Sequence, residues 1–353
     1  MAWVAVGAGQ GEHVTDSGMH GSGLLSGRLL VVAFEGWNDA GEAASGAVRT
    51  LKEQLDVYPI SEIDAERFFD FQFNRPLVSI DDDGEKQLTW PSVTVYGPTA
   101  VKVQQDRAAA EAAEAEEGDE LDGIGDNSSN IYLLLGTEPS RNWRSFTAEL
   151  MATIAETGIT GIVMLGAMLA DVPHTRPISV FVGSENADLR AELGVERSTY
   201  EGPVGILSVL GDAAEKAGIP TVSVWASVPH YVHNAPSPKA TLAIIDKLEE
   251  IIDVVIPRGD LVEESAAWEG GIDALAADDD EMATYISQLE QARDTVDSPE
   301  ASGEAIAQEF ERYLRRNDGK PGKDQGGPAG PAGPAGPSGS SGPSGSDDWR
   351  PKE

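Results

Sequence analysis

Residues 28–51 read RLLVVAFEGWNDAGEAASGAVRTL, and the fold class can be worked out from this stretch. The unbroken apolar run 28–34 is typical of a strand that is buried on both faces of a sheet. After a short polar turn, Asn38 is a residue type that commonly caps a helix. The helix that follows would have one apolar face, made of Ala40, Ala44, Ala47, Val48 and Leu51. The stretch therefore predicts a strand, a tight turn and a helix in that order.

The same alternation continues along the chain. Further apolar runs that predict strands lie at 131–135, 161–165, 178–182 and 221–225, and helical patterns lie at 141–155, 205–217 and 238–252. Two more strand-like pieces, 77–80 and 92–96, are separated by Asp81-Asp-Asp-Gly84 and predict a hairpin. This order indicates an α/β fold with a mostly parallel, mixed sheet that is covered by helices on both faces.

Composition divides the chain into segments of different character. Residues 1–27 are rich in Gly without periodicity and predict a flexible leader, and residues 28–256 hold the α/β domain. Within that domain, residues 104–130 are strongly acidic and predict a disordered insertion. Residues 257–316 predict a small helical C-terminal region, with helices near 276–296 and 300–314 that either pack together or dock on a partner. The Gly, Pro and Ser repeats of 317–353 predict a disordered tail.

Charge and composition exclude several classes of function. With 25 Lys and Arg against 60 Asp and Glu, the net charge is −35, which opposes binding of nucleic acid or of an anionic membrane through a general positive field. The chain has no Cys, which excludes disulfides and thiolate chemistry. Residues 1–27 lack the pattern of a signal peptide, and the apolar run 161–170 is about half of the roughly 20 residues that a membrane helix needs. We expect a cytoplasmic protein without a membrane segment.

Four polar clusters each follow a predicted strand directly, at residues 35–39, 136–139, 166–177 and 227–233. Parallel strands place their carboxyl ends at one edge of a sheet, so we expect the clusters to meet in one crevice. The candidate pocket residues gathered there are Glu35, Asn38, Asp39, Glu138, Asp171, His174, Arg176, His230 and His233.

The crevice has two interpretations. In the functional one, Arg176, His174 and backbone N–H groups hold a phosphate or a carboxylate. In the structural one, Asn38 and Asp39 cap a helix and the histidines donate to backbone carbonyls. The pair His230 and His233 is a weak metal signal, so we expect no metal. We also expect no cofactor, because the chain has no phosphate-binding loop and no dinucleotide-binding motif, and it has no Gly-x-Ser-x-Gly nucleophile motif either.

Four motifs carry a resemblance to a known family: FEGWNDAG at 34–41, LGTEP at 135–139, LGAMLADVPHTRP at 165–177, and VPHY at 228–231 followed by PSPKAT at 236–241. In this order they resemble the bacterial branch of the proteasome assembly chaperone 2 family over about residues 29–252. The resemblance implies a purine nucleoside phosphorylase-like fold, homo-oligomers, and a sheet edge that corresponds to the nucleoside pocket of related enzymes. Relatives that assemble the proteasome α-ring use a C-terminal hydrophobic-Tyr-any-residue motif, and this chain ends in DDWRPKE without it.

Two functions are compatible with these features of the sequence. The favoured one is a non-catalytic assembly-chaperone-like or scaffolding protein, which self-associates and binds protein partners that include proteasome-related ones. The alternative is a small-molecule enzyme, a nucleoside phosphorylase or hydrolase in which Glu35 or Asp171 is the acid or base and Arg176 holds phosphate. Some family members carry a carboxylate–amine ligase label, but no ATP-binding motif supports that activity here. The motifs favour no catalytic constellation.

Overall fold

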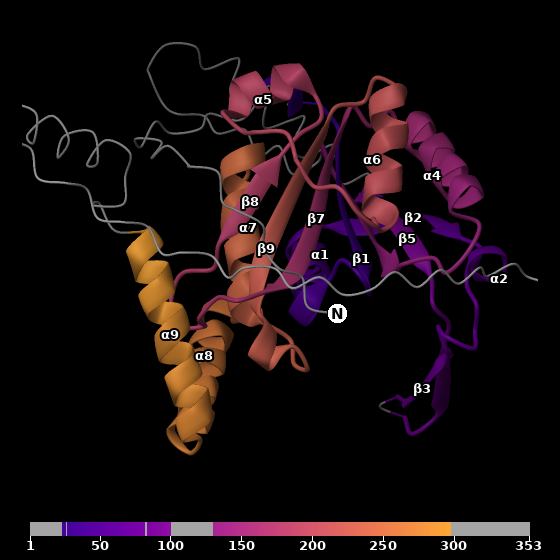
Figure 1. The fold of residues 1–353 in the computed structure, drawn as a ribbon. Helices are drawn as coiled ribbons and strands as arrows, with labels where there is room; N and C mark the ends of the chain where they lie inside the picture. The colour runs from indigo at the N-terminus through magenta and orange to yellow at the C-terminus, as the bar shows by residue number, and fades with distance from the viewer. Residues whose placement is uncertain (1–22, 26, 82, 100–129, 298–353) are drawn as a thin grey trace, which may run out of the picture. The chain divides into compact units, whose positions relative to one another are not determined.

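The computed structural model of the chain describes residues 23–25, 27–81, 83–99 and 130–297 (Figure 1). The strands are β1 (Leu29–Glu35), β2 (Val57–Ile63), β3 (Leu77–Ile80), β4 (Lys86–Thr89), β5 (Val93–Pro98), β6 (Ile131–Thr137), β7 (Gly161–Ala170), β8 (Val180–Gly183) and β9 (Thr221–Pro229). The α-helices are α1 (Ala43–Gln54), α2 (Ala65–Phe68), α4 (Trp143–Thr157), α5 (Ala187–Leu193), α6 (Ile206–Lys216), α7 (Pro238–Ile252), α8 (Leu261–Ala277) and α9 (Asp280–Val296).

Seven of the strands form one mixed sheet, in the order β2-β5-β6-β1-β7-β9-β8. The four central strands β6, β1, β7 and β9 are parallel, with Leu29 opposite both Ile131 and Gly161. The outer strands β2, β5 and β8 join antiparallel. The predicted α/β class with a mixed sheet is confirmed, and the parallel pairing is confined to the centre of the sheet.

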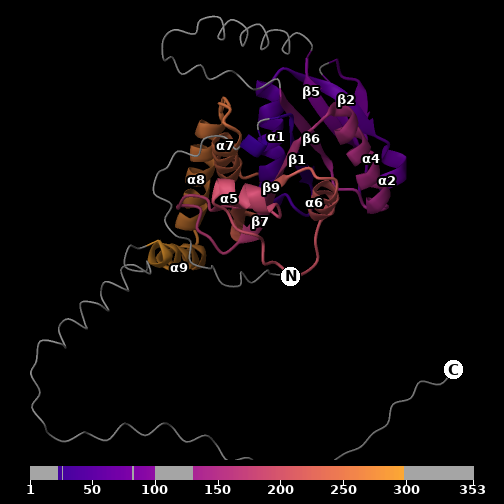
Figure 2. The ribbon, with the colours of Figure 1, turned by 90° about the horizontal axis from the view of Figure 1, so that it is seen from above.

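Helices cover both faces of this sheet. Alternate residues of β1 point to opposite faces, so Val31 and Ala33 pack with α1, α5 and α7, while Val32 and Phe34 pack with α4 and α6. Figure 2 shows α1 and α7 on one side of the strands and α4 and α6 on the other. The predicted apolar face of α1 is confirmed, because Ala44, Ala47, Val48 and Leu51 are fully buried.

The predicted hairpin between 77–80 and 92–96 is wrong in its second strand. β3 pairs with β4 instead, across a turn at 81–85. β5, which contains 93–96, enters the main sheet between β2 and β6, and its alternate residues Val93 and Val95 are buried there. The reason for the error is that β4 is mostly polar and exposed, so its sequence gives a weak strand signal. The edge strand β2, which carries Pro59, was not predicted either.

The predicted helical C-terminal region contains a helix that the sequence did not reveal. α9 confirms the pattern at 276–296, but α8 precedes it without a clear apolar stripe. At the other end, residues 23–25 of the predicted leader form a short 3₁₀ helix, and Leu25 is buried in the core.

Four sequence predictions fall wholly or mostly on residues outside those that the structure describes. They are the helix at 300–314, the tail at 317–353, nearly all of the insertion at 104–130 and most of the leader at 1–27. Across the described ranges, no helix is both long and apolar enough to cross a membrane.

Candidate functional site

The carboxyl ends of β6, β1, β7 and β9 lie at one edge of the sheet, and the four predicted polar clusters follow them there. The candidate residues nevertheless separate into three sets. Asn38, Asp39, Asp171, His230 and His233 line a groove. Glu35 and Glu138 line a smaller hollow, and His174 and Arg176 line neither of the two.

Asp39 is a helix cap. Its Oδ1 accepts hydrogen bonds from the backbone N–H groups of Ala44 at 2.9 Å and Ser45 at 3.0 Å, in the first turn of α1. The side chain is buried, and this burial raises the pKa of Asp39, partly offset by the hydrogen bonds from Ser45 and Ala44. The structural interpretation gave the capping role to Asn38 and Asp39, and of the two it is Asp39 that accepts these hydrogen bonds.

Asn38 has a different role, because it fixes the turn after β1 against two neighbouring elements. Its backbone oxygen accepts a hydrogen bond from Ala167 N–H of β7 at 2.8 Å. Its side chain packs on Gly205, where an added Cβ would lie 2.2 Å from Asn38 Nδ2. Close packing of this kind requires glycine at the start of α6.

Glu138 and Glu35 lie at the ends of the adjacent strands β6 and β1. Glu138 Oε1 accepts a hydrogen bond from Ile206 N–H at 2.8 Å in the first turn of α6, and burial raises the pKa of Glu138. Glu35 pairs with Arg49 and accepts a hydrogen bond from Thr137 Oγ1 at 3.3 Å. The two carboxylates border a hollow of about 480 Å³, which is also lined by Gly36, Asn74, Thr137, Pro139, Ser140 and Trp143.

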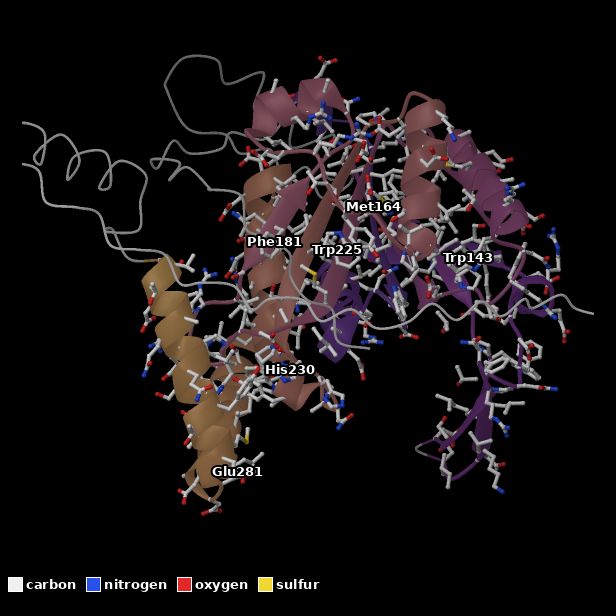
Figure 3. All side chains as sticks on the ribbon, viewed as in Figure 1. Trp143, Met164, Phe181, Trp225, His230 and Glu281 are labelled. Carbon is white, nitrogen blue, oxygen red and sulfur yellow. The ribbon has the colours of Figure 1, made fainter. Side chains whose placement is uncertain are left out.

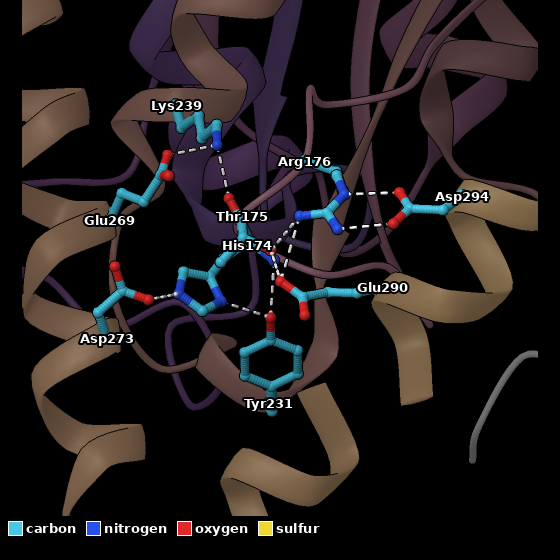
Figure 4. Close-up of polar contacts among 9 residues, drawn as sticks. All are labelled: His174, Thr175, Arg176, Tyr231, Lys239, Glu269, Asp273, Glu290 and Asp294. Carbon is cyan, nitrogen blue, oxygen red and sulfur yellow. Dashed lines mark hydrogen bonds and ion pairs between the residues drawn. The ribbon is translucent and has the colours of Figure 1, made fainter. Parts of the chain in front are cut away.

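His174 is fully buried and has a partner on each ring nitrogen (Figure 4). Nδ1 lies 2.8 Å from Tyr231 Oη, and Nε2 lies 3.0 Å from Asp273 Oδ1 on α8. The backbone N–H of His174 donates to the same Tyr231 oxygen at 2.7 Å. A neutral imidazole is satisfied when the Tyr231 O–H donates to Nδ1 and Nε2–H donates to Asp273. Burial raises the pKa of Tyr231 to about 12, so the phenol keeps its proton at neutral pH.

Arg176 is held by carboxylates of α9. Its Nε and one terminal nitrogen each lie 2.7 Å from an oxygen of Asp294, a bidentate ion pair, and its other terminal nitrogen lies 3.2 Å from Glu290 Oε1. The hydrogen bond with Asp294 raises the pKa of Arg176 and lowers that of Asp294. A phosphate could therefore bind this guanidinium only by displacing side chains of α9.

Two more contacts join the same network. Lys239 of α7 donates to the backbone oxygen of His174 at 2.5 Å and pairs with Glu269 of α8. Thr175 Oγ1 donates to Glu290 Oε1 of α9. The residues drawn in Figure 4 form what we call the polar cluster, and it ties α8 and α9 to the sheet edge: His174, Thr175, Arg176, Tyr231, Lys239, Glu269, Asp273, Glu290 and Asp294.

Sequence reasoning missed the four carboxylates of the polar cluster, although the sequence contains a signal for them. Glu269 and Asp273 are four residues apart on α8, and Glu290 and Asp294 are four apart on α9. Like charges at this spacing repel one another on one face of an isolated helix. Two such pairs therefore point to a basic partner surface, which the 174–176 segment and Lys239 provide.

Asp171, His230 and His233 lie at one end of the groove. Asp171 Oδ1 is 3.1 Å from His230 Nδ1, and His233 Nδ1 is 2.8 Å from the backbone oxygen of His230. Within the portion of the chain that the structure describes, no three His, Cys, Asp or Glu side chains come together in a way that could hold a metal ion. His230 therefore faces a carboxylate, and His233 contacts the backbone.

The groove itself opens over β7, β9 and β8 beside α6, with a volume of about 3600 Å³. Figure 3 shows Phe181 and Trp225 on this face of the sheet. Gly166 leaves room for the indole of Trp225, because an added Cβ would lie 2.6 Å from the ring. Trp37, Met168 and Phe181 also line the groove and are each more than two-fifths exposed. A space this large, with apolar side chains open to solvent, suits a polypeptide better than a small molecule, whose pockets span roughly 300–1,000 Å³.

Comparisons with known proteins identify relatives that cover about three quarters of this chain. A PAC2 family protein from Streptomyces avermitilis is 42% identical, with 73% of this chain and 98% of that chain covered and a TM-score of 0.59. A proteasome-assembly chaperone homologue from Mycobacterium tuberculosis is 38% identical, with 73% and 99% covered and a TM-score of 0.59. A Mycobacterium tuberculosis protein of unknown function is 25% identical, with 76% and 85% covered and a TM-score of 0.63.

Sequence comparison gives the same assignment. A search of curated proteins found no match to the chain at the significance threshold that the solved structures meet. The sequence model of the PAC2 family matches residues 33–276, which is more than half of the chain and includes all four motifs that carry the resemblance. The chain therefore belongs to the PAC2 family.

Proposed function

We propose that the chain is a non-catalytic, assembly-chaperone-like or scaffolding protein that acts through protein–protein contacts, with proteasome-related partners among them. The observation that carries this proposal is the state of Arg176. The side chain best suited to bind an anionic substrate at the sheet edge is instead engaged by Asp294 and Glu290. The edge that would hold a substrate serves to attach α8 and α9.

The exposed surface supports the same proposal. The groove has an apolar floor, and its size fits a polypeptide. Among the solved structures, the relative from Mycobacterium tuberculosis is described as a proteasome-assembly chaperone homologue. Self-association and a cytoplasmic location belong to the proposal as well, and the absence of Cys is compatible with a reducing compartment.

A binding experiment tests the proposal. The purified full-length chain is mixed with the purified proteasome α-subunit of Mycobacterium tuberculosis, and complexes are followed by sedimentation velocity. We expect a stable complex, and we expect none with an unrelated protein of similar negative charge in place of the chain. Absence of any complex would remove proteasome-related partners from the proposal.

A ligand screen tests the enzymatic alternative independently. Melting temperatures are measured with inorganic phosphate and with nucleosides, for the wild type and for Arg176→Gln. We expect no shift with either compound. A ligand-induced rise in the melting temperature that Arg176→Gln loses would favour the enzymatic alternative instead, because it would show that a ligand competes successfully with Asp294.

A further inference from the structure

A hairpin projects from the body and leaves apolar side chains without cover. We call residues 73–90, which contain β3 and β4, the arm, and Figure 1 shows it extending away from the main sheet. Leu77, Val78, Ile80 and Leu88 are each more than half exposed. Among the described residues, β3 pairs only with β4, so the arm is a separate two-stranded sheet.

The arm has a well-defined turn, which indicates a preformed structure. Asp81 accepts hydrogen bonds from the backbone N–H of Glu85 at 2.8 Å and from Gln87 Nε2 at 2.9 Å. Gly84 has a φ of +81°, which favours glycine. An isolated two-stranded hairpin is only marginally stable in water, so an ordered arm of this kind is stabilised when a partner covers it.

The two faces of the arm differ in character. Because residues opposite one another share a face, Val78, Ile80, Lys86 and Leu88 lie on one side, and Leu77, Ser79, Gln87 and Thr89 lie on the other. The first face is therefore three apolar side chains with one cation. Lys86 is the sole Lys or Arg of β3 and β4.

The groove has the complementary character. Its floor is apolar at Met168, Phe181 and Trp225, and carboxylates outnumber Lys and Arg among the residues that line it. Glu196 and Glu201 belong to this acidic lining and form no ion pair in the described structure. An apolar face that carries one Lys would therefore meet both apolar contacts and opposite charge in the groove.

No residue of the arm lines the groove of its own molecule. It leaves the body between β2 and β5, whereas the groove lies over β9 and β8 at the opposite end of the sheet. β5 and β9 are separated by β6, β1 and β7, which is roughly 19 Å at the usual strand spacing. Figure 1 shows the arm and β8 on opposite sides of the sheet.

We propose that the arm of one copy packs its Val78, Ile80 and Leu88 face into the groove of a second copy, with Lys86 near Glu196 and Glu201. This inference rests on the self-association proposed above and is independent of proteasome partners. Val78, Ile80 and Leu88 are each more than half exposed, and Phe73 and Trp90 at the two ends of the arm are also exposed, so the contact would cover apolar side chains that now face solvent. The contact joins two different surfaces, so repetition generates a ring if the rotation closes.

The absence of Cys allows a direct test by cross-linking. Val78→Cys and Phe181→Cys are introduced into separate full-length chains, which are then treated with a short bismaleimide, alone and as a mixture. We expect a cross-linked dimer in the mixture and no dimer with either variant alone. Glu281→Cys, at an exposed site on α9, replaces Phe181→Cys in the control mixture and should give no product.

Each other outcome would overturn the proposal in an identifiable way. Cross-linking of Val78→Cys alone would show that arms pair with arms, and cross-linking of Phe181→Cys alone would show that grooves face each other. If no mixture gave a product, the arm would not bind the groove of a second copy. It would then bind a different partner, such as another protein or a segment of this chain outside the described residues.

Sedimentation supplies a second measurement with a matched pair of variants. Leu88→Lys changes the proposed docking face, and Gln87→Lys places the same charge on the opposite face of the same strand. We expect Leu88→Lys to weaken self-association about tenfold or more and Gln87→Lys to leave it nearly unchanged. If both variants left the oligomer intact, the role of the arm in the contact would be refuted, but self-association would stand. A monomeric wild type would refute self-association itself.

Discussion

Single residues at the sheet edge have structural tasks that can be measured, and Asp39 is the clearest case. Its buried carboxylate accepts hydrogen bonds from two backbone N–H groups in the first turn of α1. We expect Asp39→Ala to lower the free energy of unfolding by about 1–2 kcal/mol. Asp39→Asn keeps an acceptor oxygen and should lose less than half of that amount. Urea denaturation at pH 7 measures both, and equal losses would mean that the negative charge, rather than the acceptor, matters.

Comparison of the wild type with Asp39→Asn also tests the effect of burial on the pKa of Asp39. Burial raises the pKa of Asp39 in the folded state, so the folded chain binds this proton more tightly than the unfolded chain does. The contribution of the carboxyl to stability is therefore complete below its unfolded pKa and is lost as the pH rises through the raised folded pKa. Asn cannot titrate, so we expect stability to shift in favour of Asp39→Asn as the pH increases from about 4 to 7. A constant difference across this range would contradict the raised pKa.

His174 and Tyr231 allow a decision between a catalytic and a structural role. Tyr231→Phe removes the oxygen that accepts the buried N–H of His174 and contacts its imidazole. We expect a loss of about 1–3 kcal/mol in the free energy of unfolding, because the buried N–H donor and the Nδ1 acceptor of His174 both lose their partner. Chemical denaturation gives the value, with Tyr58→Phe, at an exposed tyrosine of β2, as the control. An unchanged stability would argue that the pair exists for chemistry.

At the scale of elements, α9 is attached by charge more than by apolar packing. In the described structure Ile286 is its one buried side chain, while Arg176 binds two of its carboxylates. We expect Arg176→Gln to accelerate amide hydrogen exchange in α9 and to leave the central strands unchanged. Arg197→Gln removes an exposed pair with Glu185 and should change neither. Acceleration throughout the sheet would show that Arg176 supports the core instead.

The elements that could be predicted from sequence are those whose buried face shows as an apolar pattern in neighbouring residues. β1 and α7 carry unbroken or periodic apolar patterns, so the strand at 28–34 and the helix at 238–252 follow from local sequence. α8 does not, because it buries only Leu261, Ser265 and Ile272 and presents other apolar residues to solvent. The roles of His174 and Arg176 could not be predicted from local sequence either. Their partners Asp273 and Asp294 are about a hundred residues away, and no local pattern specifies that pairing.

At the scale of the whole molecule, charge and apolar surface act in opposite directions. A net charge of −35 makes two copies repel each other, whereas the proposed contact between arm and groove is mainly apolar. Screening by salt should therefore strengthen self-association between about 0.05 M and 0.5 M sodium chloride. Over the same range, the ion pairs of the polar cluster should weaken, and α9 should exchange its amide hydrogens faster. Sedimentation velocity and hydrogen exchange on one sample series measure both trends. If self-association weakened with salt in parallel with α9, the contact between copies would depend on ion pairs, and the apolar arm could not be its main component.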